Sequence, residues 1–340
     1  MSALLHVSDL KSHYRTQRGA IRAVDGVSFD LARGEVLGIV GESGSGKSTL
    51  ALSLVGLLDP PGEIIGGEVR LEGKPILGRK EADLAAILGS RIGMLFQSPE
   101  GSFNPIATIG NQLREALQAH GAGGREAAAR AEAALALVGM PRIKEVMKSY
   151  PFELSGGMCQ RAALAMVLSL NPTLLIADEP TASLDVLAQA ELAQLFARLR
   201  DSVKFSMILI SHDLGLVGAL ADRVIVMYAG KIVEEGPVER ALDSPQHPYT
   251  RGLLASLPKL NRLPADLPVI PGHAPSSVGK ALGCAFSPRC NEAVSSCREG
   301  EAPGLRRIGP EHRVACIMRE ENRAEQSERK EGGNGTGSGG

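Results

Sequence analysis

The segment GESGSGKST at residues 41–49 constrains the fold of this chain more than any other feature. It follows an apolar run at 36–40 and precedes an apolar stretch at 50–55, so the predicted order is strand, glycine-rich loop and helix. The segment matches the pattern G-x-x-x-x-G-K-[ST] through four residues: Gly41, Gly46, Lys47 and Ser48. Glycines allow such a loop to turn its backbone N–H groups inward as a nest for an anion, and the following helix adds the positive end of its dipole. The segment therefore predicts a phosphate-binding loop.

This loop offers side chains as well as backbone amides. Lys47 would reach the β- and γ-phosphates of ATP, and the Ser48 hydroxyl would ligate Mg²⁺. The surrounding backbone would hold the phosphates at four further positions: Ser43, Gly44, Gly46 and Thr49. The alternative is a flexible Gly/Ser turn, but a strand before the loop and a helix after it favour phosphate binding.

A second apolar run, at residues 173–177, ends in the acidic pair Asp178 and Glu179. In phosphate-loop ATPases, a strand parallel to the first one ends beside the Mg²⁺ ion. Asp178 would hold that ion through water, and Glu179 would orient and deprotonate the attacking water. The alternative is that Asp-Glu-Pro only caps a strand at a turn, which the upstream phosphate loop disfavours.

The sequence LSGGM at residues 154–158 begins a helix pattern that continues to residue 170. Ser155 is a natural helix N-cap, and Gly156 and Gly157 leave backbone amides exposed. This stretch predicts a second anion-binding point, which one chain needs only if it serves the nucleotide of a neighbour. The alternative is an ordinary capped helix.

Strand and helix patterns alternate along the chain. Strands are predicted at 67–72, 91–96, 173–177, 207–210 and 224–227. Helices are predicted at 107–140, with a loop at 121–124, and at 155–170 and 186–200. Glycines at positions 19, 26 and 34 predict turns between short strands in residues 1–40. The alternation predicts an α/β fold with a mostly parallel sheet.

The chain of 340 residues is long enough for two domains. Near residue 245 prolines accumulate and regular periodicity is lost, so we place a boundary there. We expect a nucleotide-binding domain at 1–245 and a small extension at 246–318. Residues 319–340 are charged and then Gly-rich, with few groups to bury, and are expected to be disordered.

Composition excludes several classes of function. The net charge is −1, Trp is absent and aromatic residues make up 3%, which argues against a nucleic-acid partner. No apolar stretch approaches the roughly 20 residues that a bilayer-spanning helix needs. The N-terminus lacks the basic and apolar regions of a signal peptide. We therefore expect a cytosolic protein whose membrane role depends on partners.

Four segments taken together resemble the nucleotide-binding subunits of ABC transporters: GESGSGKST, LSGGMCQR, LLIADEPTASLD and SHD. The resemblance covers residues 4 to about 245. It implies a P-loop NTPase core with a helical subdomain at about 98–170. It also implies an ATPase that works as a head-to-tail dimer, with two ATP molecules held between the phosphate loop of one subunit and the LSGG signature of the other.

The resemblance assigns further roles residue by residue. Gln97 matches the glutamine that touches Mg²⁺ and the attacking water, and Asp185 matches the aspartate of a loop that crosses to the other subunit. His212 matches the histidine that contacts the γ-phosphate, and Tyr14 falls where the family stacks an aromatic ring on adenine. The alternatives are an ordinary polar residue at a strand end for Gln97, a helix cap for Asp185, a structural histidine for His212 and simple packing for Tyr14. Cys159 lies at a variable position and is interpreted as a bystander.

The segment SPQHPYTRGLL at residues 244–254 resembles the C-terminal extension of peptide-class ABC importers. This implies import of di- or oligopeptides, or a related small solute, by a translocating ATPase at the cytoplasmic face of the membrane. The implied partners are two transmembrane permease subunits, a second and different ATP-binding subunit, and an extracytoplasmic solute-binding protein. A homodimer, an ABC exporter and a soluble ABC ATPase are the alternatives. An exporter would usually lack the extension.

Four cysteines gather in the last quarter of the chain: Cys284, Cys290, Cys297 and Cys316. Thiolates clustered in a cytosolic chain can ligate zinc or an iron–sulfur cluster, and their spacing is wider than in most structural zinc sites. Members of the peptide-importer group with such cysteines are associated with a [4Fe-4S] cluster, so the resemblance implies one here. Zinc, or four unliganded buried thiols, are the alternatives.

Overall fold

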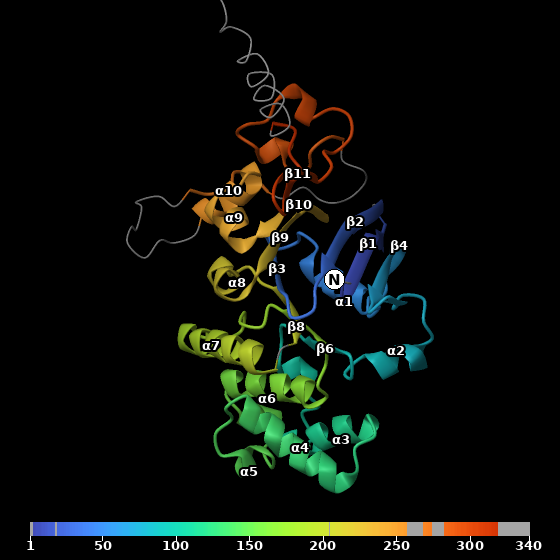
Figure 1. Ribbon diagram of the computed structural model, residues 1–340, viewed down its shortest axis with the longest axis vertical. Coiled ribbons are helices and arrows are strands. Elements are labelled where there is room, and N and C mark those ends of the chain that lie inside the picture. Colours follow the sequence, from blue (N-terminus) through green and yellow to red (C-terminus); the bar gives the residue numbers. More distant parts are fainter. Residues whose placement is uncertain (1–2, 18, 204, 257–267, 274–281, 319–340) are drawn as a thin grey trace, which may run out of the picture.

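The computed structural model describes residues 3–17, 19–203, 205–256, 268–273 and 282–318. Figure 1 shows an elongated arrangement, with helices α3 to α6 at one end, the C-terminal extension at the other and the main sheet between them. The tail predicted to be disordered, 319–340, lies outside the described residues.

The main sheet confirms the predicted α/β fold. Within the described residues it has eight strands in the order β11-β12-β10-β9-β3-β8-β7-β6. They are β3 (Val36–Val40), β6 (Ile92–Leu95), β7 (Leu174–Asp178), β8 (Ser206–Ile210), β9 (Arg223–Tyr228), β10 (Lys231–Pro237), β11 (Arg306–Gly309) and β12 (His312–Val314). The strands from β9 to β6 pair in parallel, and the others are antiparallel. Parallel strands end at the same edge, so the loops after β3, β6, β7 and β8 meet there.

A second, antiparallel sheet has the order β2-β1-β4-β5. Its strands are β1 (Leu5–Thr16), β2 (Gly19–Leu31), β4 (Gly62–Leu71) and β5 (Lys74–Pro75). The expectation of short strands between glycine turns is wrong at Gly26, which lies inside β2 with a φ of +83°. Register shifts between β1 and β2 absorb this residue, so one long hairpin replaces the predicted short strands.

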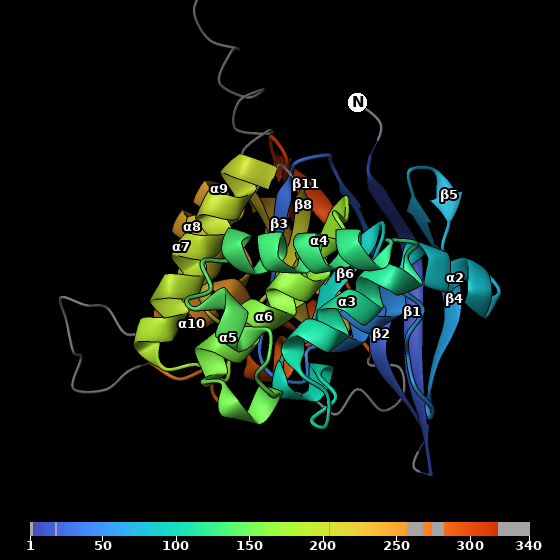
Figure 2. The same cartoon turned by 90° about the horizontal axis from the view of Figure 1, so that it is seen from below.

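Helices flank the sheets and make up the end of the molecule opposite the extension (Figure 1). They are α1 (Lys47–Leu54), α2 (Glu81–Ile87), α3 (Ile109–Ala119), α4 (Gly124–Leu137), α5 (Ile143–Val146), α6 (Gly156–Ser169), α7 (Val186–Val203), α8 (Leu214–Leu220), α9 (Val238–Asp243) and α10 (Pro248–Ala255). The break between α3 and α4 confirms the loop predicted near residues 121–124. In Figure 2, α7, α8 and α9 lie on one side of the main sheet, and the antiparallel sheet lies on the other.

Strand β3 is buried on both faces, which explains its uninterrupted apolar sequence. Val36 and Val40 pack into the core beneath the helices, whereas Leu37 and Ile39 pack into the core shared with α1 and the antiparallel sheet. Since side chains alternate along a strand, β3 joins the two cores and fixes the position of the loop that follows it.

The extension is attached to the edge of the main sheet. Strand β12 pairs with β10 across the boundary predicted near residue 245. Glu234 of β10 is fully buried, and its carboxylate accepts hydrogen bonds from His312 Nε2 (2.8 Å) and from the backbone N–H groups of Gln246 (2.7 Å) and His247 (2.9 Å). These contacts fasten both ends of the extension to one strand of the core.

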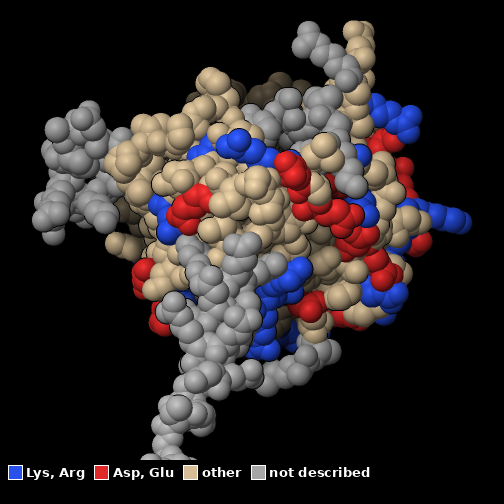
Figure 3. Space-filling view, turned by 90° about the horizontal axis from the view of Figure 1, so that it is seen from above, with Lys and Arg blue, Asp and Glu red and all other residues tan. Residues whose placement is uncertain are grey.

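The surface at the extension end carries both signs of charge. Figure 3 views this end, and basic and acidic side chains are interspersed over the part that is visible. Among the described residues, no helix is both long enough and apolar enough to cross a membrane.

Candidate nucleotide-binding site

The loop at residues 41–46 is packed against its neighbours and needs its glycines. Gly46 has a φ of +103°, and a Cβ atom there would lie 2.0 Å from the carbonyl oxygen of Ala23 in β2. A Cβ atom on Gly41 would lie 2.3 Å from the carbonyl oxygen of Met227 in β9. Such contacts exclude any side chain, so the loop is a fixed element and not the flexible turn considered as the alternative.

Lys47 begins α1 and is only 6% exposed. Its ammonium donates hydrogen bonds to the carbonyl oxygens of Gly41 (2.7 Å) and Glu42 (3.1 Å). Burial lowers the pKa of Lys47, and three nearby carboxylates oppose that shift: Glu179, Asp178 and Glu42. A cation taken out of water in this way gains strongly from an incoming phosphate.

Ser48 and Asp178 meet between α1 and β7. The Ser48 hydroxyl donates a hydrogen bond of 3.2 Å to Asp178 Oδ1. Burial raises the pKa of Asp178, and the nearby Glu179 adds to this, while the Ser48 hydrogen bond opposes it. A hydroxyl and a desolvated carboxylate at one point fit the predicted Mg²⁺ site, because a divalent cation would relieve the cost of the buried charge.

Glu179 follows β7 in the left-handed backbone region, with a φ of +48°. This conformation is uncommon for residues other than glycine and marks strained functional positions. Its Oε2 lies 2.7 Å from Nδ1 of His212, and its backbone N–H donates to the carbonyl oxygen of Ile210 (2.8 Å). The predicted base and the predicted γ-phosphate-contacting histidine therefore touch each other.

One cavity brings most of the predicted nucleotide residues together. It is lined by Ser43, Gly44, Gly46, Lys47, Ser48, Thr49, Gln97, Glu179 and His212. Gln97 follows β6, so the ends of four adjacent parallel strands contribute to this cavity. Tyr14 of β1 contacts its margin, with a hydroxyl 3.3 Å from Thr49 Oγ1.

The predicted signature residues lie in a different cavity. Its lining includes Ser155, Gly156, Gly157 and Asp185, and it shares no lining residue with the first cavity among the residues described. Ser155 caps α6 by accepting from the backbone N–H of Met158 (3.3 Å), and Asp185 accepts from that of Ala188 (2.9 Å). Both predicted helix caps are therefore present. The nucleotide-binding roles of Ser155 and Asp185 stay predictions.

Sequence reasoning missed the role of Glu42, inside the phosphate loop. Its carboxylate forms a two-pronged ion pair with Arg289, and its backbone N–H donates to the Tyr249 hydroxyl (2.7 Å). Both partners belong to the extension. The available signal was chemical, because an acidic residue in an anion-binding loop needs a compensating cation.

The four C-terminal cysteines line one cavity together with His247 and Phe286. Burial raises the pKa of the Cys284 and Cys290 thiols. Among the described residues, no group of three or more His, Cys, Asp or Glu side chains is arranged to hold a single metal ion. Four thiols around one space are a ligand set used both by structural zinc ions and by iron–sulfur clusters.

Cys159, interpreted as a bystander, is buried in α6. Burial raises the pKa of its thiol to about 11, and the nearby Glu100 adds to this shift. A thiol with so little thiolate at neutral pH is chemically inert.

Comparison with known proteins places this geometry in a family. Residues 24–182 match the family model for ABC transporters, and residues 233–297 match the model for the C-terminal region of oligopeptide/dipeptide transporters. The fold resembles that of the ATP-binding cassette MJ0796, solved as a dimer in a post-hydrolysis state with ADP and Pi. That likeness has a TM-score of 0.62 at 25% identity and covers 69% of this chain and 98% of the other.

Curated relatives match almost the whole chain. The oligopeptide transport ATP-binding protein AppD of Bacillus subtilis is 44% identical over 96% of this chain and 100% of its own length. The dipeptide transport ATP-binding protein DppD of Haemophilus influenzae is 42% identical over 92% of this chain and 95% of its own length.

The fold and the site define an ATPase of the ABC class. Within that class, the chain belongs to the family of ABC transporter ATP-binding proteins that carry the oligopeptide/dipeptide transporter C-terminal region.

Proposed function

We propose that this chain powers an importer of di- or oligopeptides, or of a related small solute, through ATP-driven closure of a dimer of ATP-binding subunits. The names of AppD and DppD, which describe oligopeptide and dipeptide transport, support the choice of solute class. The matched C-terminal region favours this choice over an exporter or a soluble ABC ATPase.

One observation on the signature supports the dimer. Among the described residues of one subunit, no contact requires glycine at positions 156 and 157. A Cβ atom on Gly156 would lie 3.8 Å from Leu184 Cδ2, and one on Gly157 would lie 3.5 Å from Ala188 Cβ. These are ordinary contacts, and neither residue has a positive φ. Glycine at both positions is explained if a second molecule approaches the backbone amides closely, as the phosphates of a neighbouring subunit's ATP would.

In the proposed mechanism, Lys47 and the loop amides bind the β- and γ-phosphates, and the partner's signature amides close over the γ-phosphate. Glu179 accepts a proton from the attacking water, the water oxygen bonds to the γ-phosphorus, and the bond to the β–γ bridging oxygen breaks to give ADP and phosphate. His212 contacts the γ-phosphate, and Gln97 orients the water. Ser48, Asp178 and Gln97 would hold Mg²⁺, which neutralises phosphate charge when bound.

The proposed partners follow from the family. Two permease subunits receive the ATPase dimer at the cytoplasmic face of the membrane, and an extracytoplasmic binding protein delivers the solute. The second ATP-binding subunit is a different chain, which would make the ATPase a heterodimer.

The test is coupling in the assembled complex. The chain is co-purified with two permease subunits and a second ATP-binding subunit, and ATP hydrolysis is measured in proteoliposomes with and without peptide-loaded binding protein. We expect loaded binding protein to raise turnover and the unloaded form to raise it less. Turnover that does not respond to the loaded form would contradict the importer.

We also propose that Cys284, Cys290, Cys297 and Cys316 hold a [4Fe-4S] cluster, which would cross-link a segment with little apolar core. Their shared cavity supports this proposal. The test is anaerobic purification followed by visible absorbance and by iron and sulfide analysis. Stoichiometric zinc, or protein free of iron in the reduced state, would contradict the cluster.

A further inference from the structure

The phosphate loop contains a carboxylate that should oppose its own function. Glu42 lies directly after Gly41, and Lys47 donates a hydrogen bond to its backbone carbonyl. An acidic side chain beside the site of a triphosphate repels the ligand unless its charge is compensated. The position of that side chain therefore affects nucleotide binding.

Arg289, from the cysteine-bearing extension, compensates this charge. Its Nη1 lies 2.7 Å from Glu42 Oε2, and its Nη2 lies 3.0 Å from Glu42 Oε1. The guanidinium is buried and also donates to the carbonyl oxygen of Pro271 (2.8 Å) and to the Tyr228 hydroxyl (3.3 Å). Because the Pro271 carbonyl and the Tyr228 hydroxyl also fix the guanidinium, it holds the carboxylate in one place.

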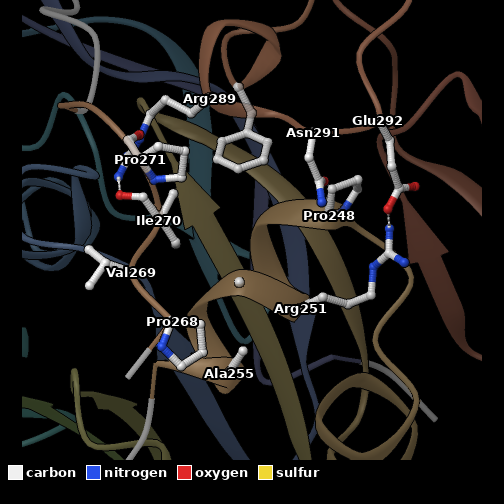
Figure 4. A pocket seen from close by; sticks show the side chains of 12 residues that line it. Pro248, Arg251, Ala255, Pro268, Val269, Ile270, Pro271, Arg289, Asn291 and Glu292 are labelled. Carbon is white, nitrogen blue, oxygen red and sulfur yellow. Dashed lines mark hydrogen bonds and ion pairs between the residues drawn. The ribbon is translucent and has the colours of Figure 1, made fainter. Parts of the chain in front are cut away.

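Figure 4 shows Arg289 at one side of a cavity in the extension, where its guanidinium is hydrogen-bonded to the backbone beside Ile270. Arg251 lies at the other side and pairs with Glu292. The two arginines thus line the same cavity, but only Arg289 reaches the phosphate loop.

Tyr249 provides a second contact from the extension to the same residue. Its hydroxyl accepts the backbone N–H of Glu42 at 2.7 Å. The ring is fully buried against Tyr228 and Phe286, with ring centroids 4.6 Å and 5.4 Å away. The extension therefore forms hydrogen bonds with both the backbone and the side chain of Glu42.

We propose that Arg289 and Tyr249 are positioning residues for the phosphate loop. Through Glu42, they draw a negative charge away from the triphosphate and fix the first turn of the loop, so that an ordered extension raises the affinity for ATP. Phe286 and Arg289 lie between Cys284 and Cys290. The segment that contains these cysteines therefore also contains the arginine that pairs with Glu42 of the phosphate loop.

The test is equilibrium binding of ATP to the full-length chain in EDTA, where hydrolysis does not interfere. Arg289→Met leaves Glu42 uncompensated and should weaken ATP binding about tenfold or more, as expected from the loss of a charge-assisted hydrogen-bonded pair. Arg251→Met is the matched control, because it removes an arginine of the same cavity without touching the loop. We expect its ATP affinity to stay within about twofold of wild type.

A double variant separates positioning from folding. In Glu42→Gln/Arg289→Met the charge that needs compensation is gone, so ATP affinity should recover most of the loss, whereas a defect in folding would persist. Tyr249→Phe provides an independent arm and should weaken binding by about two- to tenfold, through loss of one hydrogen bond. Arg289→Met with wild-type affinity, an equal loss in Arg251→Met, or no recovery in the double variant would each overturn the proposal.

Discussion

Glu179 and His212 are joined by a contact of 2.7 Å between the carboxylate Oε2 and the imidazole Nδ1, at the ends of the adjacent parallel strands β7 and β8. An ionised carboxylate only accepts hydrogen bonds, so the imidazole tautomer that fits this contact carries its proton on Nδ1. The Glu179 side chain is buried, whereas that of His212 is 65% exposed. In this structure the proposed base is hydrogen-bonded to the histidine that is proposed to contact the γ-phosphate.

Glu179→Gln should separate ATP binding from hydrolysis. The amide keeps the shape of the side chain but cannot take a proton from water, so phosphate release should fall by about a hundredfold or more. ATP affinity should remain close to wild type, and ATP should promote closure of the dimer on size-exclusion chromatography. Phosphate release near the wild-type rate would remove Glu179 as the base.

Asp178→Asn should stabilise the fold while impairing catalysis. Burial raises the pKa of Asp178, so the fold prefers the protonated carboxyl. The stability from this preference is full below the unfolded-state pKa and is lost as pH rises through the folded-state pKa. At pH 7.5 the ionised carboxylate therefore costs stability, and asparagine removes that cost while keeping an oxygen that accepts from Ser48.

The measurement is urea unfolding of the nucleotide-free protein at several pH values. The midpoint of Asp178→Asn should exceed that of wild type at pH 7.5, and the difference should shrink toward acidic pH. Mg²⁺-dependent ATP hydrolysis should fall by about a hundredfold or more because the proposed Mg²⁺ site loses a negative charge. A lower midpoint at neutral pH would contradict the inferred cost of the buried charge.

The sequence predicted those parts of the site whose residues lie close together along the chain. The phosphate loop and the acidic pair after β7 each follow one buried strand, so local pattern places them, and the parallel sheet brings their ends together. The cap of α6 by Ser155 is also a local feature and is present.

What sequence could not supply depends on contacts between distant segments. Arg289 reaches Glu42 across 247 positions of the chain, and no local pattern encodes such a pair. The pairing of β12 with β10 is a second example, because Pro-rich sequence near residue 245 hides the return of the chain to the sheet. Gly26 is a third, since a bulge inside a strand and a turn look alike in sequence.

Gly156→Ala tests the proposed dimer at a position that the single subunit does not constrain. The new methyl group meets only Leu184 Cδ2 at 3.8 Å, and alanine favours a helix over glycine, so the free energy of unfolding should stay level or rise by up to about 1 kcal/mol. ATP binding to one subunit should not change. Hydrolysis by the assembled complex should fall about tenfold or more, if the amide must approach a partner's phosphate. Full activity would show that the signature does not contact nucleotide so closely.

Glu234→Gln should loosen the extension from the core. The buried carboxylate accepts from His312 and from two backbone N–H groups, and an amide in its place offers one acceptor fewer and two extra donors. We expect a loss of about 2–4 kcal/mol in the free energy of unfolding, measured in urea, because buried donors lose their partner.

Glu239→Gln is the matched control: this side chain is exposed on α9, so the same change of charge should alter stability by less than about 0.5 kcal/mol. Limited proteolysis should cut the Glu234→Gln protein first beyond residue 243, where α9 ends. Equal stability of the two variants would mean that the buried cluster does not fasten the extension.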